Sequence, residues 1–412
     1  MDKSLHTVTL DRDKCKGCIA CMKRCPTEAI RVRNGKAKVY YDRCIGCGEC
    51  VRMCPHQAKL PAYDPLESIF KFKYRIAVPA PSLFGQFNNL DDVNLVLNAL
   101  LELGFDDVFE VARGAELISE ETRNLMREGK LKKPIISSAC PAVLELIMMR
   151  YHSLLSHVID LVSPADVALR LAREKAEKEG IPPEDIGVFF ISPCPAKVYA
   201  LKTGMGLNKP AADGVLSIGE LYFKLLGVMS RLKDKPLKQL SKTGILGVRW
   251  AASGGESLGI YQNKYLAADG MENINNVLKA MEDGSLNYID FVELGACPSG
   301  CVGGVLNVEN PFVARVRIRA LRDKLPPVAN RLEETEKPRE FYHWEQPPRA
   351  QDVYRLDSDF VVAMEKMQKI ESIYRTLPHL DCGACGAPSC RAFAEDVARG
   401  ETSYDMCTRR ES

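Results

Sequence analysis

Residues 15–26 read CKGCIACMKRCP, and residues 44–55 repeat the arrangement as CIGCGECVRMCP. In each copy three cysteines are separated by two residues, and a fourth follows three residues later, directly before a proline. Cysteines spaced in this way can hold three corners of one cubane iron–sulfur cluster, while the fourth cysteine reaches the other cluster. The spacing therefore predicts one cluster on Cys15, Cys18, Cys21 and Cys54, and a second on Cys44, Cys47, Cys50 and Cys25.

The paired motifs resemble those of the bacterial two-cluster ferredoxins. Two structural zinc sites are the alternative, since zinc also binds Cys-x2-Cys pairs. The repeat and the interleaved fourth cysteine favour clusters instead. Residues 1–72 are accordingly expected to form an α+β ferredoxin-like domain, which has little apolar content and needs its metal to fold.

The composition of the whole chain is that of an ordinary globular protein. Of 412 residues, 46% are hydrophobic and 27% charged, and a formal net charge of +2 gives no argument for nucleic acid or a membrane surface as a partner. No apolar run approaches the ~20 residues of a membrane-spanning helix, and the N-terminus lacks the apolar core of a signal peptide. We expect a cytoplasmic protein, whose reduced thiols bind metal rather than form disulfides.

Residues 73–325 alternate between apolar strands and helices of about 14–18 residues, which is typical of parallel α/β layers. The expected strands are Tyr74–Pro79, Asp107–Val111, Pro134–Ser138, Ile186–Ser192 and Phe291–Leu294. The expected helices are Leu90–Leu103, Ala115–Glu128, Val143–His157, Ser163–Glu179, Ile218–Leu232 and Ala314–Lys324. Loops are expected between residues 250 and 275. A proline-rich, charged linker is expected at 326–350, before a C-terminal domain at 351–412 that opens with a helix at Ser358–Leu377.

Four central cysteines are far apart in the sequence. Cys140, Cys194 and Cys297 each follow an expected strand, and the carboxyl ends of parallel strands converge on the ligand site in α/β folds. Cys301 lies four residues after Cys297, in a turn flanked by glycines. Taken singly, each would be read as a core residue, because cysteine is among the most buried residue types. Their common position at strand ends favours a shared site.

Three segments around these cysteines resemble the motifs of the FeFe-hydrogenases. SSACP at 137–141 is similar to Thr-Ser-Cys-Cys-Pro, and SPCPAK at 192–197 to Met-Pro-Cys-x-x-Lys. ELGACPSGCVGG at 293–304 is similar to Glu-x-Met-Ala-Cys-x-x-Gly-Cys-x-x-Gly-Gly. The order of the motifs also matches, as does the upstream ferredoxin domain. The resemblance implies an α/β FeFe-hydrogenase-like domain of two parallel-sheet lobes at 73–325.

The resemblance also implies a cofactor. In that family a 4Fe–4S cubane is joined through one cysteine to a two-iron subcluster carrying CO, cyanide and a bridging azadithiolate. Carried over, Cys140, Cys194 and Cys297 ligate the cubane, and Cys301 bridges to the two irons. Lys197 would donate a hydrogen bond to one cyanide, and Pro79 and Ala80 would line the second.

Several positions depart from the family pattern. Ala139 stands where the family has the cysteine that passes protons to and from the distal iron. Ser192 and Gly295 replace two methionines that pack the subcluster, and Ala200 replaces a glutamate that orients the lysine. Losing a positioned acid–base group slows proton transfer by ~10²–10⁴-fold. The resemblance with these changes implies an enzyme of low turnover that takes H2 to protons and electrons and acts as an H2 or redox sensor.

The last cysteine set is Cys382, Cys385, Cys390 and Cys407. It resembles the 4Fe–4S domain of electron-transfer and corrinoid iron–sulfur proteins, with structural zinc as the alternative. With this set the chain is expected to hold four 4Fe–4S clusters. The extra cluster suggests a redox partner protein or a signalling kinase or phosphatase, and a homodimer is one option for the oligomeric state.

Two other functions stay open. Hydrogenase-like proteins of cytosolic iron–sulfur assembly share the fold without a two-iron site, whereas an ordinary catalytic hydrogenase would need another proton route.

Overall fold

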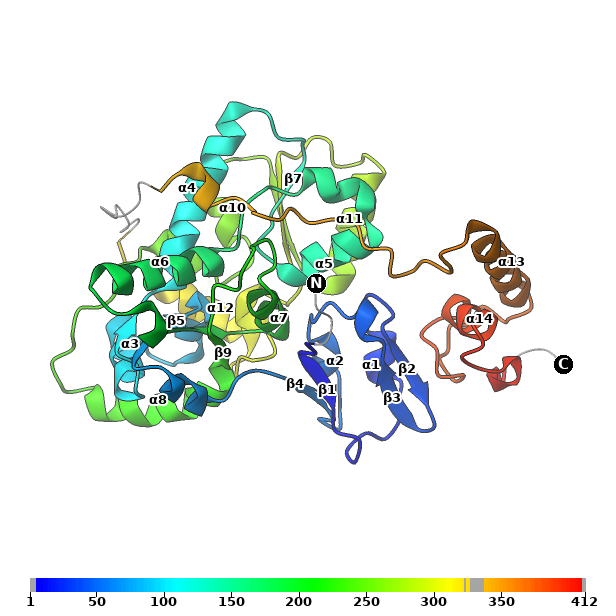
Figure 1. The fold of residues 1–412 in the computed structure, drawn as a ribbon, viewed down its shortest axis with the longest axis horizontal. Helices are drawn as coiled ribbons and strands as arrows, with labels where there is room; N and C mark the ends of the chain where they lie inside the picture. Colours follow the sequence, from blue (N-terminus) through cyan, green and yellow to red (C-terminus); the bar gives the residue numbers. More distant parts are fainter. Residues whose placement is uncertain (1–4, 322–323, 327–336, 410–412) are drawn as a thin grey trace. The chain divides into compact units, whose positions relative to one another are not determined.

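The computed structural model describes residues 5–321, 324–326 and 337–409. These residues form two compact units, which are described separately (Figure 1). The larger unit is residues 62–349 with the short N-terminal stretch, and the smaller joins residues 8–61 to residues 350–412. The α/β fold with parallel sheets, predicted from the alternating strands and helices, is confirmed.

The main sheet of the larger unit has four parallel strands in the order β6-β5-β8-β9. Its centre is β8, whose sequence IGVFFIS is buried at every position and is covered on both faces. Val188 and Phe190 pack toward α4 and α6, whereas Phe189 and Ile191 pack toward α3 and α8. The strands are β5 (Tyr74–Pro79), β6 (Asp107–Val108), β8 (Ile186–Ser192) and β9 (Gly214–Ser217). The covering helices are α3 (Val93–Glu102), α4 (Val111–Glu128), α6 (Pro164–Lys178) and α8 (Ile218–Leu232).

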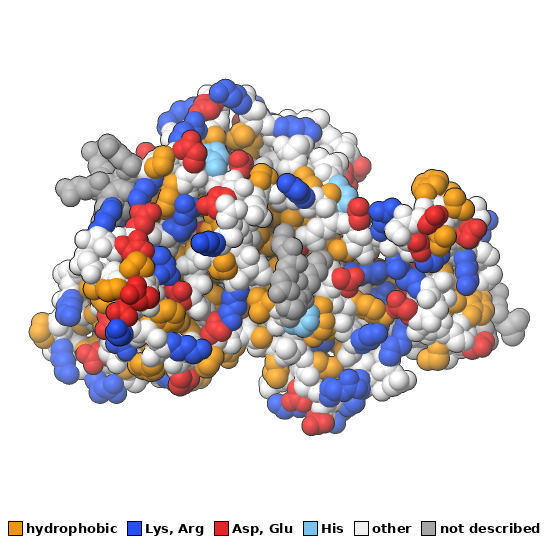
Figure 2. All heavy atoms as spheres, viewed as in Figure 1, with side chains coloured by type: hydrophobic (Ala, Val, Ile, Leu, Met, Phe, Trp, Pro, Cys, Tyr) orange, Lys and Arg blue, Asp and Glu red, His pale blue; other side chains and the backbone are white. Residues whose placement is uncertain are grey.

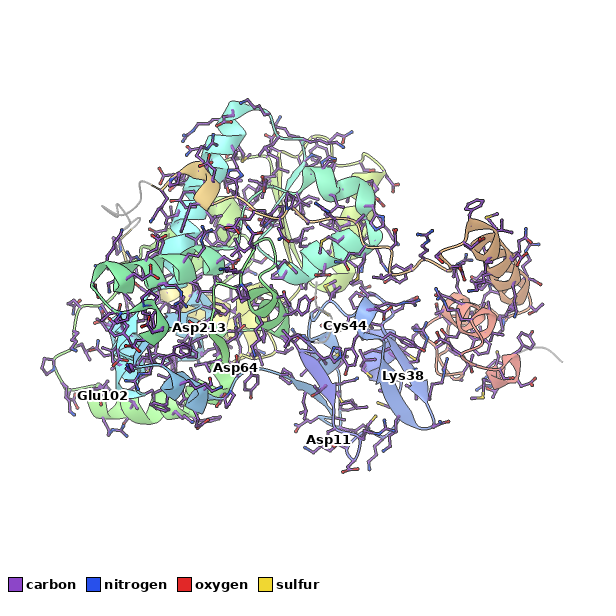
Figure 3. The ribbon with its side chains drawn as sticks, viewed as in Figure 1. Asp11, Lys38, Cys44, Asp64, Glu102 and Asp213 are labelled. Carbon is purple, nitrogen blue, oxygen red and sulfur yellow. The ribbon has the colours of Figure 1, made fainter. Side chains whose placement is uncertain are left out.

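Side chains and helix caps fix the edges of this sheet. Asp64 accepts a hydrogen bond from the Val215 amide at 2.8 Å, and Asp213 accepts one from the Val188 amide at 2.7 Å (Figure 3). Ser217 caps α8, because its hydroxyl accepts from the Gly219 amide at 3.1 Å. These bonds satisfy backbone donors that the strands and helix termini would otherwise leave unpaired.

A second parallel sheet has the order β10-β11-β7. Its strands are β7 (Ile135–Ile136), β10 (Tyr265–Asp269) and β11 (Phe291–Gly295). The expectation of loops between 250 and 275 is wrong, because β10 and α10 lie there. The reason is physical: β10 reads YLAAD, is at the edge of its sheet and is nowhere fully buried, so it lacks a strong apolar signal. The remaining helices are α5 (Pro141–Arg150), α7 (Pro195–Thr203), α9 (Ile245–Arg249), α10 (Gly255–Gly259), α11 (Met271–Glu282) and α12 (Pro311–Ala320).

Part of the expected linker packs into the larger unit. Phe341 and Tyr342 are buried in its core, and Arg339 pairs with Glu121 at 2.7 Å. Residues 327–336 of that segment lie outside the described residues. Residues 337–346, which were expected to be linker, therefore pack against the core of the larger unit.

The smaller unit combines the two ends of the chain. Its N-terminal half repeats a strand–helix pattern, in which β1 pairs with β4 and β2 pairs with β3, both antiparallel. In its C-terminal half α13 packs against α14. The elements are β1 (Val8–Leu10), α1 (Ala20–Lys23), β2 (Ile30–Arg33), β3 (Lys36–Val39), α2 (Glu49–Arg52), β4 (Lys59–Pro61), α13 (Phe360–Arg375) and α14 (Cys390–Ala398).

The face drawn in Figure 2 carries charges of both signs mixed with apolar side chains and shows no broad field of one sign. Among the described residues, no helix combines the length and the apolar character that crossing a bilayer requires.

Candidate metal centres

The central cysteines lie where the parallel strands end. Cys140 precedes the first turn of α5 and Cys194 the first turn of α7, just beyond the ends of β7 and β8. Cys297 follows β11, and Cys301 begins a short 3-10 helix. Both parallel sheets therefore contribute cysteines from their carboxyl ends, the edge at which α/β folds place their ligand sites.

Lys197 is the common neighbour of these four cysteines. Its Nζ lies 3.6 Å from the Cys301 Sγ. Desolvation lowers the pKa of Lys197, but the charges of Cys301, Cys194, Cys140 and Cys297 outweigh it and raise the pKa well above its ordinary value. Desolvation in turn raises the pKa of Cys194 to about 11, against the opposing effect of Lys197. All four cysteine sulfurs therefore lie close enough to Lys197 to interact with its charge.

The loops that carry the cysteines are packed backbone to backbone. A Cβ added to Gly304 would overlap the carbonyl oxygen of Pro193, and one added to Gly303 would overlap that of Pro298. The Leu306 amide donates to the Pro193 oxygen at 2.9 Å. The Cys301 turn is therefore seated directly on the Cys194 turn, and its glycines are required by space.

The substituted positions lie around this centre. The hydroxyl of the fully buried Ser192 accepts from the Cys194 amide at 3.3 Å and donates to the Cys194 carbonyl at 3.0 Å. A Cβ added to Gly295 would make only ordinary contacts, at 3.8 and 3.9 Å, so the backbone here does not require glycine for space. Ala80, at the end of β5, is buried and its amide donates to Ile191 at 3.2 Å. Ala200 is also buried, on α7.

A buried acidic pair that sequence reasoning did not single out lies beside Ala139. The Ser137 hydroxyl donates to Glu256 Oε2 at 2.6 Å and accepts from the Ala139 amide at 3.2 Å. Desolvation, followed by the charge of Glu293, raises the pKa of Glu256 well above its ordinary value. Desolvation also raises the pKa of Glu293, although Ser257 donates to that carboxylate from its amide at 2.9 Å and its hydroxyl at 2.8 Å. No periodic pattern marks Glu256, because it lies in α10, a helix of only five residues that begins and ends with glycine.

The N-terminal cysteines gather in the two interleaved sets that the spacing predicts. One hollow is lined by Cys25 together with Cys44, Cys47 and Cys50. In the other set, desolvation raises the pKa of Cys21, and its neighbours Cys18, Cys54 and Cys15 add to the rise. Backbone amides point at the sulfurs: Ala58 donates to Cys54 and Ala29 to Cys25, each at 3.2 Å.

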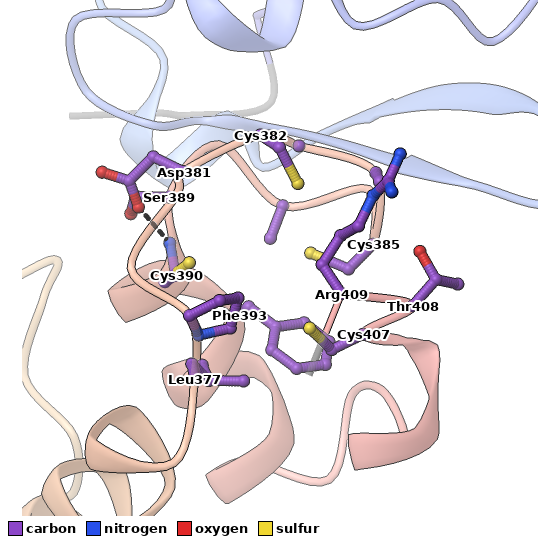
Figure 4. A pocket seen from close by; sticks show the side chains of 14 residues that line it. Leu377, Asp381, Cys382, Cys385, Ser389, Cys390, Phe393, Cys407, Thr408 and Arg409 are labelled. Carbon is purple, nitrogen blue, oxygen red and sulfur yellow. Dashed lines mark hydrogen bonds between the residues drawn. The ribbon is translucent and has the colours of Figure 1, made fainter. Parts of the chain in front are cut away.

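The C-terminal cysteines also surround a hollow (Figure 4). Its wall includes the apolar side chains of Leu377 and Phe393. The Cys390 amide donates to Asp381 Oδ1 at 2.6 Å, which fixes the start of α14. The four cysteines that line it are Cys382, Cys385, Cys390 and Cys407.

The donor sets fit iron–sulfur clusters. In the smaller unit, two sets of four thiols line apolar-walled hollows that suit a cubane, whose sulfides accept hydrogen bonds from nearby amides. In the larger unit, the four central thiols share the neighbouring cation Lys197. Among the described residues, no group of three or more His, Cys, Asp or Glu side chains is placed to hold a single metal ion.

Comparison with protein families identifies one hydrogenase-like and two iron–sulfur regions in the chain. The family described as "Iron only hydrogenase large subunit, C-terminal domain" matches residues 73–258 and 227–305. A 4Fe-4S dicluster domain matches residues 7–55, and an Fe-S cluster family matches residues 377–409.

Individual relatives are distant. The chain is 25% identical over 402 residues to Iron hydrogenase 1 of Clostridium pasteurianum, covering 78% of this chain and 69% of that protein. It is 24% identical over 255 residues to "Probable cytosolic Fe-S cluster assembly factor Bm6838" of Brugia malayi, covering 51% of this chain and 56% of that protein. A solved variant of the FeFe-hydrogenase HydA1 from Chlamydomonas reinhardtii shares the fold, with a TM-score of 0.50 and 19% identity over 70% of this chain and 96% of that one.

Proposed function

The chain belongs to the family of iron-only hydrogenase large subunits, and we propose that it binds H2 at the central site, activates it slowly and serves as an H2 or redox sensor. The observation that carries the proposal is the combination of four cysteines around Lys197 with an alanine at position 139. The four cysteines and Lys197 can hold the cofactor. The alanine at position 139 leaves no proton-transfer group beside it.

The residues present divide the work of such a site. Cys140, Cys194 and Cys297 would hold the cubane, and Cys301 would carry the two-iron subcluster, which when bound supplies the chemistry H2 = 2 H⁺ + 2 e⁻. Lys197 offers a compact cation to an anionic ligand of that group.

Proton movement in this chain is the weak step. Ala139 has no donor or acceptor in its side chain, so the first transfer from the reacting centre is lost. Ser137 and Glu256, hydrogen bonded at 2.6 Å, provide the acid–base groups that lie beside it. A route through them is longer than a direct thiol, and we therefore expect turnover to be low but not zero.

The test is to mature the full chain with the two-iron cofactor and to measure infrared spectra and H2 oxidation on the same sample. CO and cyanide bands with slow H2 oxidation are expected. Absence of the bands after maturation refutes the hydrogenase function. Turnover equal to that of ordinary hydrogenases refutes the sensor and leaves a catalytic enzyme with another proton route.

Ala139→Cys provides the matched variant. It restores a thiol beside Ser137 and should raise the rate of H2 oxidation while leaving the infrared bands in place. An unchanged rate would show that the thiol position does not limit turnover.

The second candidate is an iron–sulfur assembly function, favoured by the similarity to the Brugia malayi protein over half of this chain. It predicts full iron content in the cysteine sets but no CO or cyanide bands after maturation. The same spectrum therefore separates the two functions.

We further propose that the protein works in the cytoplasm with H2 and protons as its small-molecule partners. A redox partner protein and a signalling kinase or phosphatase would receive its output.

A further inference from the structure

The C-terminal cysteine loop contacts the first cysteine motif directly. A Cβ added to Gly383, the residue after Cys382, would lie 3.1 Å from the Met22 Cε and 3.6 Å from the Ile19 Cδ1. Lys23 Nζ donates to the carbonyl oxygens of Asp381 at 2.6 Å and Pro388 at 2.8 Å. Ile19 and Met22 are the chain neighbours of Cys18 and Cys21. The two cysteine loops therefore pack against each other within one compact unit.

A backbone contact extends this junction to β2. The Val32 amide donates to the Gly386 carbonyl at 2.9 Å, and Arg33 Nη1 donates to the Cys385 carbonyl at 3.1 Å. A Cβ at Gly386 would overlap the Val32 carbonyl oxygen, and its φ of +78° also favours glycine. The loop that carries Cys385 thus approaches the strand as closely as a backbone can.

Buried charge pairs secure the same face. Asp396, on α14, accepts two hydrogen bonds from Arg31, at 2.6 and 2.9 Å, and one from Arg33 at 2.5 Å. Arg31 is 1% exposed and Asp396 2%. Arg43, next to Cys44, pairs with Glu395 at 2.8 Å. Charges buried to this degree persist only when they are paired, so the junction is a specific interface.

We propose that the C-terminal cluster exchanges electrons directly with the cluster of Cys15, Cys18, Cys21 and Cys54, as one internal relay. One electron leaves the reduced cluster and enters the oxidised one, and no bond or proton changes. Cys382 is exposed, so the relay reaches the surface on the side of the C-terminal loop. A redox partner is then served through this loop. The inference concerns the smaller unit alone and does not rest on H2 chemistry.

The test uses the full chain, reconstituted anaerobically with iron and sulfide and without the two-iron cofactor. After reduction with dithionite, electron paramagnetic resonance should show magnetic interaction between the C-terminal cluster and the N-terminal pair. In Cys385→Ser, which removes one C-terminal ligand, iron should fall by roughly four atoms per chain and that interaction should vanish. A wild-type spectrum with full iron but no such interaction overturns the proposal. So does a C-terminal set that holds zinc in protein purified from cells.

Two glycine variants separate docking from cluster binding. Gly386→Ala places a methyl group on the Val32 carbonyl, whereas Gly400→Ala, at a similar φ of +76°, meets nothing within 4 Å. We expect Gly386→Ala to keep its iron but to lose the magnetic interaction between the C-terminal and N-terminal clusters. Gly400→Ala should keep both the iron and the interaction. If Gly386→Ala loses its iron, the variant Asp396→Asn is used instead. Asp396→Asn weakens the docking of the C-terminal segment on β2 and changes no residue of a cysteine loop. Interaction unchanged in Asp396→Asn, with β2 shown to be undocked, overturns the proposal.

Discussion

Replacing Asp396 with asparagine tests whether the buried charge pair holds the C-terminal segment on β2. The carboxylate accepts three N–H bonds, two from Arg31 and one from Arg33. Asparagine keeps the shape but offers one oxygen and one NH2 group, which turns a donor toward an arginine donor. Arg31 is then left buried with its charge uncompensated.

The expected cost follows from this burial. Removing one partner of a buried ion pair destabilises by about 3–5 kcal/mol, whereas an exposed pair contributes about 0–1 kcal/mol. Asp185 pairs with Lys73 at 3.0 Å, and the lysine side chain is 82% exposed. Asp185→Asn is therefore the matched control, with the same chemical change at an exposed pair.

Hydrogen–deuterium exchange measures the docking directly. The Val32 amide is bonded to the Gly386 carbonyl across the junction, so its exchange requires the junction to open. A loss of about 3–5 kcal/mol should accelerate exchange of the peptide containing Val32 roughly 150- to 4000-fold. Exchange in Asp396→Asn at the rate of wild type or of Asp185→Asn would refute the reasoning.

Four further predictions concern the central site and its supporting glycines. Glu256→Gln should lower H2 oxidation by about 10²-fold or more, measured beside unchanged infrared bands. In the folded protein the pKa of Glu256 lies above its ordinary value of 4.5, so above pH 4.5 the folded state binds more protons than the unfolded state. The stability of the wild-type protein should therefore fall as the pH rises above that value. The urea midpoint of Glu256→Gln, which cannot titrate at this position, should depend less on pH. Lys197→Met should weaken retention of the two-iron cofactor about 10–100-fold, since a hydrogen bond from a charged group contributes roughly 1.5–3 kcal/mol; the ratio of cyanide bands to iron reports this. Gly303→Ala should lose the central iron because its Cβ overlaps Pro298, whereas Gly227→Ala, with nothing within 4 Å, should keep it.

The sequence allowed much of the fold to be predicted where the signal is local. Strand β8 and helix α8 have the predicted bounds, because each depends on a pattern of adjacent residues. The two-residue spacing of the N-terminal cysteines likewise groups them into two sets without knowledge of the rest of the chain.

Other features depend on partners that are distant in sequence. Glu256 becomes a buried acid only because Ser137 and Glu293 converge on it from other elements, and Asp396 meets Arg31 across 365 positions. A charged residue in a turn or on a helix is normally solvent-exposed, so no pattern marked either one. The edge strand β10 was missed for a related reason, since its half-exposed residues do not alternate clearly.

The composition of the smaller unit from both ends of the chain has a consequence for its biosynthesis. The β2 face emerges from the ribosome some 360 residues before α14, a delay of roughly 20–70 s at the usual 5–20 residues per second. During this interval the face that will be covered presents the charged side chains of Arg31, Arg33 and Arg43 beside the apolar side chains of Ile19 and Met22. Exposed arginine side chains stay hydrated, so the nascent N-terminal half can remain free of aggregation until the C-terminal segment has been synthesised and packs against it.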